Sequence, residues 1–337
     1  YIYMPKNVAI VYPYVAHYRE PLFERLLDRN SNASLKNRYW LFSDFQSNVP
    51  SLRLVDPCRS FENDGSWQWR RLTNLWLPGG ALWQKGVISL AFSSRLDVIV
   101  FLGDAHYLSS WVGCLLARLK GKKVLMWTHG VRVKESGLKA IVRLAFYQLS
   151  DGLLLYGKRA KALLGEMGIR EEKMRVIFNS LDYQAQRDRA ESISRSEARR
   201  LVDELFAIPG RHRVIYSGRL VKGKKLGLLV SAIAKLRRRG NAVTLLIVGD
   251  GPEEESLREL VSNCALGEFA LMVGACYDER LLARYFLASD LAVIPAAAGL
   301  SVMHAMAYGV PVITDNDFSR HGPEVEAIVL DVDSPGG

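Results

Sequence analysis

Short apolar runs alternate along this chain with segments in which apolar residues recur at helical spacing. The runs carry almost no charge, which is typical of strands buried on both faces of a sheet. Because parallel strands need helical crossovers between them, the alternation predicts an α/β fold with parallel sheets. The predicted strands cover residues 8–12, 39–42, 97–102, 123–127, 152–156, 176–178, 214–216, 244–248, 269–273, 291–294 and 310–313. The predicted helices cover residues 21–28, 111–119, 138–149, 197–206, 226–236, 253–261, 279–287 and 300–308.

The alternation is interrupted before residue 210 and then restarts. Residues 187–200 contain five Arg and no long apolar run, which indicates a solvated linker. With 337 residues the chain is long enough for two domains. The sequence therefore predicts an N-terminal domain at 1–183, a linker at 184–212 and a C-terminal domain at 213–337. Ligands of such sheets bind beyond the carboxyl ends of the strands, so we expect two Rossmann-like domains that face a cleft.

One segment needs a separate argument because it resembles a membrane span. Residues 291–314 contain no Asp, Glu, Lys or Arg and are long enough to cross a bilayer. However, Pro295, Gly299, Gly309 and Pro311 interrupt the segment. These breakers divide it into a strand, a short helix and a second strand, so we expect it to be buried inside the C-terminal domain.

The composition excludes several classes of protein. Apolar residues make up 49% of the chain and charged residues 24%, which excludes a disordered, collagenous or coiled-coil protein. The net charge of +10 favours an acidic partner, whether nucleic acid, an anionic membrane or a phosphorylated small molecule. The four cysteines lie far apart and form no CxxC pair. We therefore expect neither a zinc site nor a disulfide framework, and we expect a reducing compartment.

The second domain carries a series of motifs: YSGRLVKGKKLGLL from Tyr216, LIVGDGPE from Leu246, ASDLAVIP from Ala288 and AGLSVMHAMAYGVPVI from Ala298. In this order and spacing they resemble the donor domain of the family-four glycosyltransferases, which have the GT-B fold. The resemblance covers roughly residues 213–330, whereas the first domain matches only in architecture. It implies transfer of a sugar from a nucleotide diphosphate-sugar, usually with retention of anomeric configuration. It also implies a site without a metal and without a cofactor other than this substrate.

The first motif supplies positive charge after a strand. Arg219, preceded by Gly218, and Lys224 match the Arg and Lys that bind the donor diphosphate in the family. Arg can hold two phosphate oxygens at once, whereas Lys supplies a point charge. Negative charge builds on the departing diphosphate, so fixed cations are what this chemistry needs. The alternative is a solvated basic loop, because Lys222 and Lys225 are adjacent.

The later motifs place glycines between strands and helices. Gly299 and Leu300 begin a predicted helix, and they match the glycine-hydrophobic pair that touches the phosphates in the family. Helix-start amides preceded by glycine form a phosphate cradle. The sequence GDGP at 249–252 also joins a strand to a helix, but glycine for a tight turn and proline at a helix start explain it structurally.

The sequence departs from the family pattern at two positions. The usual motif has two Glu that contact the donor sugar and the ribose, and this chain has Ala296 and His304 there. His304 can make one hydrogen bond to a ribose or sugar hydroxyl, and the alternative is a packed core histidine. Glu324, in the sequence RHGPE, resembles the Pro-Glu loop that faces the donor in the family. It is therefore the candidate to replace a lost carboxylate.

In the first domain, polar side chains follow the ends of predicted strands. Those assigned to the acceptor side are Tyr14, His17, Arg19, Asp104 and His106. His129 follows the strand at 123–127, where family members often carry a His. The resemblance implies that His129 binds the donor sugar or assists proton movement from the acceptor hydroxyl. Each His taken singly also fits a structural role.

Tryptophans cluster between Trp67 and Trp83, beside Arg70 and Arg71. Amphipathic Trp with Arg suits a bilayer interface with anionic head groups. The alternative is a hairpin or loop that packs its own aromatic rings. Nucleic acid also attracts aromatic and basic residues, but no nucleic-acid-binding fold signature accompanies them, so we expect no nucleic-acid partner.

The predicted protein is a bacterial-type hexosyltransferase of polysaccharide biosynthesis. Its acceptor would be a glycan or a lipid-linked molecule, and it would lie in the cytoplasm, peripherally at the inner face of the cytoplasmic membrane. The absent Glu pair keeps open a non-catalytic protein that binds a nucleotide sugar, and the architecture keeps open a sugar-nucleotide epimerase. The family usually continues beyond residue 329 with a last helix, so we expect a C-terminal domain that is truncated at its end.

Overall fold

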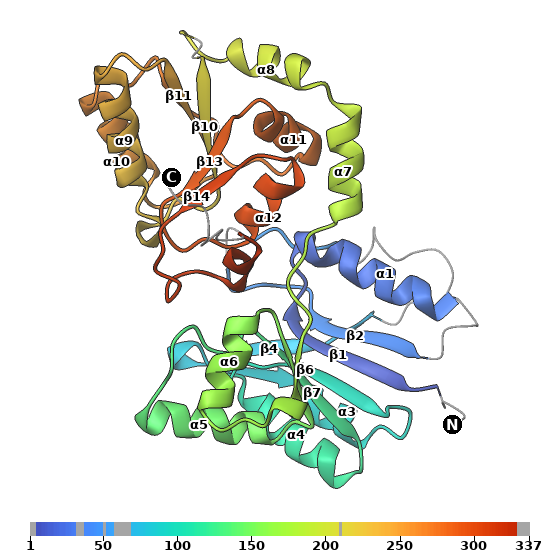
Figure 1. Ribbon diagram of the computed structural model, residues 1–337. Helices are drawn as coiled ribbons and strands as arrows, with labels where there is room; N and C mark the ends of the chain where they lie inside the picture. The colour runs from blue at the N-terminus through green and yellow to red at the C-terminus, as the bar shows by residue number, and fades with distance from the viewer. Residues whose placement is uncertain (1–4, 32–36, 50–51, 57–68, 209–210, 329–337) are drawn as a thin grey trace. The chain divides into compact units, whose positions relative to one another are not determined.

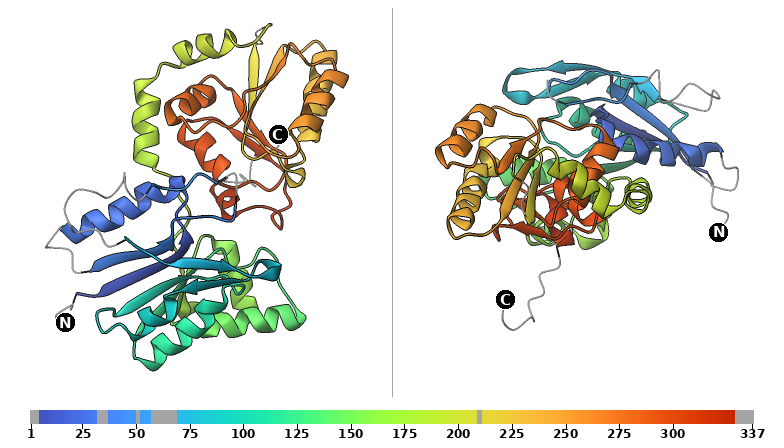
Figure 2. Two further views of the ribbon diagram at one scale, coloured as in Figure 1. Left: turned by 180° about the vertical axis from the view of Figure 1, so that it is seen from behind. Right: turned by 90° about the horizontal axis from the view of Figure 1, so that it is seen from above.

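The computed structural model describes residues 5–31, 37–49, 52–56, 69–208 and 211–328, and the chain divides into two compact units (Figure 1). Unit 1 is Tyr1–Leu181 and unit 2 is Asp182–Gly337. Each unit has its own parallel sheet with helices packed on it, as the alternation in the sequence predicts (Figure 2).

The sheet of unit 1 has the strand order β3-β2-β1-β6-β7-β8-β9, and every pair of neighbours is parallel. The strands are β1 (Asn7–Tyr14), β2 (Arg38–Asp44), β3 (Trp69–Arg71), β6 (Val98–Leu102), β7 (Lys123–Thr128), β8 (Gly152–Leu155) and β9 (Met174–Val176). In β1, Val8 and Ile10 are buried in one apolar cluster and Ala9 and Val11 in another. Because successive side chains point to opposite faces, both faces of this sheet are covered.

Helices and a hairpin connect the strands of unit 1. The elements are η1 (His17–Arg19), α1 (Glu20–Ser31), α3 (Val87–Phe92), α4 (Leu108–Leu119), α5 (Gly137–Gln148), α6 (Lys158–Glu166) and η3 (Glu171–Lys173), with the hairpin strands β4 (Thr73–Trp76) and β5 (Leu82–Lys85) joined through η2 (Pro78–Gly80). The hairpin, α3 and α6 lie outside the predicted elements.

The sheet of unit 2 has the strand order β12-β11-β10-β13-β14 and is also parallel throughout. Its strands are β10 (His212–Ser217), β11 (Val243–Val248), β12 (Ala270–Met272), β13 (Leu291–Ile294) and β14 (Val312–Thr314). Every residue of β11 is buried, with Leu245 and Ile247 in one cluster and Leu246 and Val248 in another. The helices are α9 (Leu226–Arg238), α10 (Glu254–Asn263), α11 (Glu279–Leu287) and α12 (Leu300–Ala307), with short turns η4 (Lys222–Lys224) and η5 (Pro323–Ala327).

The segment expected to be a linker, 184–212, is part of unit 2 instead. It forms α7 (Tyr183–Ser192) and α8 (Arg195–Asp203), and α8 packs against α11. Ile193, Val202 and Phe206 are buried in the apolar cluster that α11 shares. The many Arg residues suggested a solvated segment, but apolar residues at helical spacing between them still form a packed face.

The uncharged segment 291–314 folds as β13, α12 and β14, as predicted. Pro295 and Gly299 separate β13 from α12, and Gly309 and Pro311 separate α12 from β14. Over the described ranges of the chain, no helix is both long enough and apolar enough to cross a membrane.

Candidate functional site

In unit 2, Lys224 reaches from the β10–α9 loop to the loop that precedes α12. Its Nζ donates a hydrogen bond of 2.5 Å to the carbonyl oxygen of Ala297. Ala297 has a φ of 50°, a left-handed conformation that leads the chain into Gly299 at the start of α12. The predicted cation and the predicted helix start are therefore neighbours. A fixed positive charge beside the first amides of a helix is an arrangement that binds phosphate.

Arg219 lies in the same loop as Lys224 and is exposed. The hydroxyl of Tyr216, at the buried end of β10, donates a hydrogen bond of 2.9 Å to the Arg219 carbonyl oxygen. This bond fixes the backbone where the strand ends, while Arg219 itself is exposed.

The glycines of GDGP serve the same loop, as the structural reading of that motif predicts. Gly249 has a φ of 150°, and a Cβ there would collide with the carbonyl oxygen of Gly218. The Leu220 N–H donates to the Asp250 carbonyl oxygen at 2.7 Å. The backbone at Gly249 therefore packs directly on the backbone at Gly218, which only glycine permits. This contact supports the basic loop after β10.

Glu324 is buried beside the start of α12. Its Oε2 would lie 4.0 Å from a Cβ on Gly299, and a Cβ on Gly322 would collide with it. Its side chain is only 7% exposed. A carboxylate is favourable at this end of a helix because it opposes the helix dipole.

The loop before α12 is also held by His321, a residue of the RHGPE sequence for which no role was predicted. Its Nδ1 accepts a hydrogen bond of 2.9 Å from the Ala298 N–H. Its proton is therefore on Nε2, which lies 2.7 Å from an Asp315 carboxylate oxygen. His321 is 2% exposed, so it positions the loop from inside the unit. Its position three residues before the predicted site residue Glu324 is the sequence feature that could have indicated this role.

His304 lies within α12, and its ring packs on neighbouring helices. Its Nδ1 is 3.0 Å from Nε2 of Gln186, a buried residue of α7. Its ring stacks on Phe286 of α11 at a centroid distance of 6.1 Å, and Tyr308 stacks on the same ring at 5.7 Å. These contacts are the ones expected if His304 is a packed core histidine, the alternative named above. The donor contact of His304 stays a prediction.

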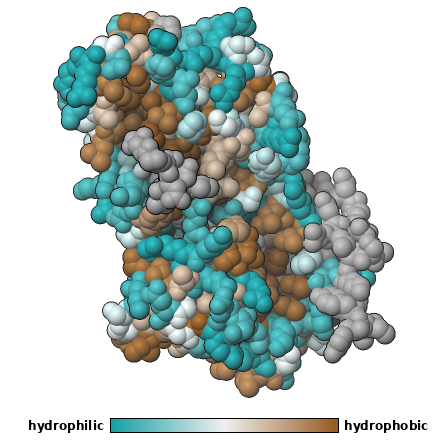
Figure 3. Space-filling view, viewed as in Figure 1, coloured by the Kyte–Doolittle hydropathy of each residue, from teal (hydrophilic) through white to brown (hydrophobic). Residues whose placement is uncertain are grey.

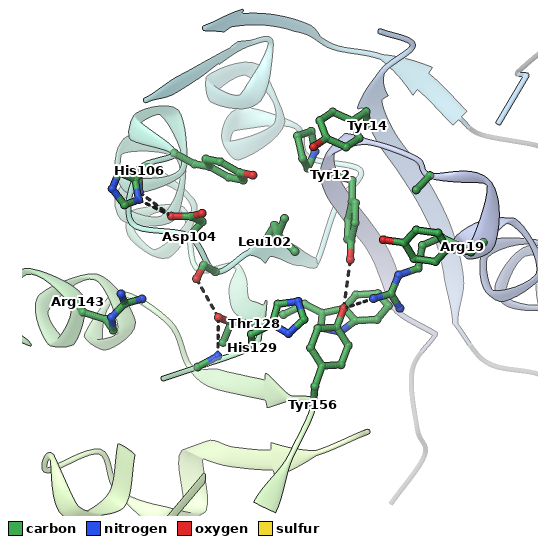
Figure 4. A pocket seen from close by; sticks show the side chains of 17 residues that line it. Tyr12, Tyr14, Arg19, Leu102, Asp104, His106, Thr128, His129, Arg143 and Tyr156 are labelled. Carbon is green, nitrogen blue, oxygen red and sulfur yellow. Dashed lines mark hydrogen bonds and ion pairs between the residues drawn. The ribbon is translucent and has the colours of Figure 1, made fainter. Parts of the chain in front are cut away.

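Unit 1 contains a cavity of about 370 Å³ at the carboxyl ends of β1, β6, β7 and β8 (Figure 4). The predicted residues that line it are Tyr14, Arg19, Asp104, His106 and His129. The strand-end rule therefore brings together most of the predicted acceptor residues and His129. Aromatic residues missed by the sequence analysis complete the wall: Tyr12, Tyr18, Tyr107, Trp127 and Tyr156. Tyr156 directly follows β8, so the same rule applied to that strand would have found it.

Arg19 lines this cavity and is 7% exposed. Its Nη2 donates a hydrogen bond of 2.8 Å to the Tyr156 hydroxyl, and its guanidinium lies over the rings of Trp127 and Tyr156 (Figure 4). The Tyr156 hydroxyl is also 3.4 Å from that of Tyr12. Burial raises the pKa of both tyrosines, so both remain neutral hydrogen-bonding groups.

His129 lies against Tyr156, with ring centroids 4.5 Å apart. Loss of solvation, followed by the charges of Arg19 and Arg132, lowers the pKa of His129 to about 4. The imidazole is therefore neutral near pH 7. Across the cavity, His106 Nδ1 lies 2.9 Å from an Asp104 oxygen, and both side chains are well exposed.

His17 is not among the residues that line the cavity. Its Nδ1 lies 3.2 Å from the carbonyl oxygen of Arg53, so it fixes the loop after β1. Trp67 lies outside the described residues. Trp76 and Trp83 belong to the β4–β5 hairpin, and the Trp76 ring packs edge-on against Tyr107.

Arg70 and Arg71, the basic residues of the tryptophan cluster, contact neighbouring rings. Arg70 lies over Trp40 and Arg71 lies over Phe45. Arg71 also pairs with Asp44 at 3.3 Å. Both arginines belong to β3 and contact rings outside the cluster, and both side chains remain exposed.

Comparison with known sequences agrees with the motifs. The sequence profile of the family "Glycosyl transferases group 1" matches residues 201–324. A GDP-mannose-dependent alpha-(1-6)-phosphatidylinositol monomannoside mannosyltransferase of Mycobacterium tuberculosis is 30% identical over 214 residues, covering 59% of this chain and 54% of that protein. The alpha-monoglucosyldiacylglycerol synthase of Streptococcus pneumoniae is 25% identical over 187 residues, covering 55% of this chain and 41% of that protein. The chain thus spans about half the length of these relatives.

Comparison with solved structures extends the likeness to both units. A glycosyltransferase from Rickettsia africae has a TM-score of 0.68 at 18% identity, covering 97% of this chain and 82% of the other. The Anabaena protein HepE in complex with UDP has a TM-score of 0.67 at 16% identity, covering 96% and 83%. At such identities the likeness concerns the fold. Residues 201–324 thus carry the profile of the group 1 glycosyltransferases, and the chain as a whole has the GT-B fold.

Proposed function

We propose that the protein transfers a hexosyl group from a nucleotide diphosphate-sugar to an acceptor hydroxyl. The observation that carries this proposal is the position of Lys224, whose ammonium bonds the Ala297 carbonyl oxygen in the loop that leads into α12. Unit 2 would bind the diphosphate there, with Arg219 from the same loop. Both cations would stabilise the negative charge that develops on the departing diphosphate.

The acceptor would enter the aromatic cavity of unit 1. Aromatic walls with a few polar groups suit the apolar face and hydroxyls of a sugar ring. Neutral His129 would hydrogen-bond a donor or acceptor hydroxyl, and Tyr12 and Tyr156 would orient it. The printed names of two relatives concern a phosphatidylinositol monomannoside and a monoglucosyldiacylglycerol. These names support an acceptor that is glycan- or lipid-linked. Its use at the inner face of the cytoplasmic membrane is part of the proposal.

Glu324 would take over part of the task of the absent glutamates. Its carboxylate lies beside Gly299, next to the place proposed for the phosphates. A carboxylate accepts hydrogen bonds from two hydroxyls of a sugar, which suits the donor hexose. Because it would also repel the diphosphate, Arg219 and Lys224 are needed to offset its charge. We further propose that transfer retains the anomeric configuration and needs no metal.

A panel of UDP-, GDP- and dTDP-sugars tests the proposal. We expect one of them to release nucleotide in the presence of a lipid or oligosaccharide acceptor, with the same rate after chelator treatment. NMR of the product would show the donor's anomeric configuration. Replacing Arg219 or Lys224 with Ala should lower turnover on the order of 100-fold. Lys222→Ala is the matched control, since Lys222 is an exposed cation of the same loop. Near-normal turnover in both Arg219→Ala and Lys224→Ala would contradict the proposed diphosphate site.

A non-catalytic nucleotide-sugar binder is the second candidate, and specific observations favour it. Ala296 is fully buried and offers no carboxylate, and His304 is hydrogen-bonded to Gln186. A protein of this kind would bind a nucleotide sugar in calorimetry yet release no nucleotide with any acceptor. An epimerase would instead interconvert two nucleotide sugars without an acceptor, which chromatography of the donor alone would detect.

A further inference from the structure

Arg19 places a buried positive charge in the wall of the unit 1 cavity. Its Nη2 donates a hydrogen bond of 2.8 Å to the Tyr156 hydroxyl, and its guanidinium carbon lies within 5.7 Å of the ring centroids of Tyr18, Trp127 and Tyr156 (Figure 4). All four residues line the cavity. Burying a charge is costly, so a charged side chain that is kept in a cavity wall indicates a ligand that uses it.

Surface hydropathy is a weaker guide to the ligand than this buried charge. On the face of unit 1 seen in Figure 3, hydrophilic residues (teal) and hydrophobic residues (brown) intermingle. Exposed charges on such a surface are solvated by water and gain little from a partner. A buried guanidinium is already desolvated and held in place by its packing, so a bound group meets a preorganised site. The cavity therefore indicates the chemistry of a ligand more directly than the outer surface does.

The electrostatic potential on this side of the cavity is positive. The charges that lower the pKa of His129 are those of Arg19 and Arg132, which add to the loss of solvation. Among the lining residues that the structure describes, Asp104 is the one carboxylate, and its Oδ1 lies 2.9 Å from Nδ1 of His106. The Asp104 side chain is 46% exposed, so solvent screens its charge. The region around Arg19 and His129 therefore favours an anion.

The balance of charge favours an anion with a single negative charge. Arg143, the second arginine of the cavity wall, donates two hydrogen bonds to the Glu135 carboxylate, at 2.6 and 3.0 Å. The charge of Arg143 is therefore neutralised within the protein, and His129 is neutral near pH 7. Arg19 supplies one positive charge to a ligand. This matches a carboxylate better than a phosphate monoester, which carries nearly two negative charges.

Hydrogen-bond donors gather around the same point of the cavity. A guanidinium is a planar fork that can hold both oxygens of a carboxylate. The Tyr156 hydroxyl accepts a bond from Arg19, so its own proton is directed elsewhere, and the Tyr12 hydroxyl lies 3.4 Å from it. Burial raises the pKa of both tyrosines, so both keep their protons as donors. These donors would bind a carboxylate while the aromatic wall packs on the apolar face of a sugar ring.

We propose that Arg19 is a specificity-determining residue that selects an acceptor carrying a carboxylate, a uronic acid. The inference rests on the proposed function, because it names the class of acceptor that the cavity would admit. The carboxylate would lie against the Arg19 guanidinium and the tyrosine hydroxyls. A volume of about 370 Å³ is small for a ligand pocket, which suits a single sugar residue. A neutral hexose of the same shape would lack the charge-assisted hydrogen bonds to Arg19.

Direct binding tests the inference without a donor and without transfer. The probes are the methyl glycosides of glucuronic, galacturonic and mannuronic acid, each paired with the neutral methyl hexoside of the same configuration, and glucose 6-phosphate as the doubly charged probe. In calorimetry with the full chain at neutral pH, we expect a uronic acid to bind about tenfold or more tightly than its neutral counterpart. Equal binding within all three pairs would overturn the inference, and tighter binding of glucose 6-phosphate would overturn the choice of a carboxylate.

The His129 imidazole reports on the same binding event. A carboxylate bound at Arg19 adds a negative charge near this ring, whose present neighbours include the Tyr156 ring at a centroid distance of 4.5 Å. The NMR titration midpoint of His129 should therefore rise from about 4 by about one pH unit when the uronic acid is saturating. The neutral hexoside should leave the midpoint unchanged. A midpoint that stayed in place with bound uronic acid would put the carboxylate elsewhere and contradict the role of Arg19.

Variants assign the preference to Arg19. Arg19→Gln should remove the preference for the uronic acid over the hexoside, whereas Arg19→Lys, which keeps the charge without the fork, should retain part of it. Tyr156→Phe keeps the ring and removes the hydroxyl, so it should weaken uronic acid binding about threefold or more, and it serves if Arg19→Gln does not fold. Arg132→Gln is the matched control, because Arg132 is an exposed cation outside the lining residues. An equal loss of preference in Arg132→Gln would mean a general charge effect and would overturn the inference.

The outcomes separate this inference from the proposed function. Selective binding of a uronic acid that depends on Arg19, without nucleotide release from any donor, would support the carboxylate site and overturn the transfer. Nucleotide release with neutral acceptors and no preference for a uronic acid would support the transfer and overturn the selection by Arg19. An unchanged preference in folded Arg19→Gln would overturn the selection as well.

Discussion

His304 stands where the family pattern has a glutamate, and its surroundings in unit 2 are those of a packed side chain. Gln186 engages one ring nitrogen, and Phe286 stacks on the ring. A glutamate at this position would lack the stacking contact, whereas an imidazole satisfies both neighbours. The histidine that replaces the family's glutamate therefore has a hydrogen-bonding partner, Gln186, on α7.

We expect His304→Ala to lower the free energy of unfolding by about 1–3 kcal/mol, because it removes a stacked ring and leaves buried Gln186 without this hydrogen bond. Urea denaturation measures the change. Gln186→Ala should cost a similar amount, so it serves as the control for donor affinity measured by calorimetry. A fall in affinity for His304→Ala alone would show that the ring also reaches the donor, as the sequence predicts. Unchanged stability in His304→Ala would contradict the packing role.

His129 makes the second prediction at this scale. Reduced solvation and the charges of Arg19 and Arg132 lower its pKa to about 4, well below the ordinary value for histidine. It is therefore neutral from pH 5 upward, and it becomes charged only as the pH falls through about 4. NMR titration of the histidine Cε1 protons, with His129→Gln to assign the signal, should give a midpoint near 4 for this residue. A midpoint near 6.5 would contradict the environment described here.

Strand ends predicted which loops reach the cavity, but they did not predict which side chains do. His17 and Arg19 lie on one short turn, η1, yet His17 contacts the Arg53 carbonyl oxygen and Arg19 lines the cavity. The direction of each side chain depends on tertiary partners such as Tyr156, which lies far along the chain. Sequence periodicity contains no information about contacts between residues so far apart in the chain.

At the scale of elements, the strands were predictable because their burial is simple. β11 is apolar at nearly every position and buried throughout, so its sequence could hardly fit another element. The helix α7 was not predictable in this way, because few of its residues are apolar. It is held on α12 partly by the polar contact between Gln186 and His304. Its Arg-rich exposed side therefore dominated the sequence pattern and suggested a linker.

The helix α8, which the sequence predicts at 197–206, gives a prediction at the scale of elements. Arg213, in β10, is completely buried. It donates hydrogen bonds to the Asp203 carboxylate at the end of α8 and to the Ala288 carbonyl oxygen. Removing Asp203 would leave the guanidinium buried without its counter-charge, so Asp203→Ala should cost about 3–5 kcal/mol of unfolding free energy.

Chemical denaturation of Asp203→Ala measures that cost. Arg213→Met should cost less than Asp203→Ala, since it removes the buried charge and leaves Asp203 at a partly exposed position. The exposed pair Arg187–Glu191 on α7 offers a matched control, and Glu191→Ala should change stability by about 0–1 kcal/mol. A cost for Asp203→Ala as small as that of the control would show that α8 is held by its apolar face alone.

At the scale of the whole molecule, each unit has its own sheet and its own apolar clusters, and the candidate groups are divided between them. Unit 1 contains the aromatic cavity, and unit 2 contains the basic loop and the start of α12. The sequence predicted this division because the donor motifs all follow residue 213. It could not predict the shape of the cavity in unit 1, where the resemblance to the family is only architectural.

This division predicts where a nucleotide protects the chain. Binding stabilises the elements that contact the ligand, by ~2.7 kcal/mol at a free concentration 100 times the dissociation constant. Hydrogen exchange of the full chain with saturating UDP or GDP should therefore slow at the β10–α9 loop and at the start of α12, with little change around the cavity of unit 1. Lys224→Ala should abolish the protection, and Lys222→Ala should retain it. Protection confined to the strand-end loops of unit 1 would mean that the nucleotide binds in the aromatic cavity, and the roles proposed for the two units would have to be exchanged.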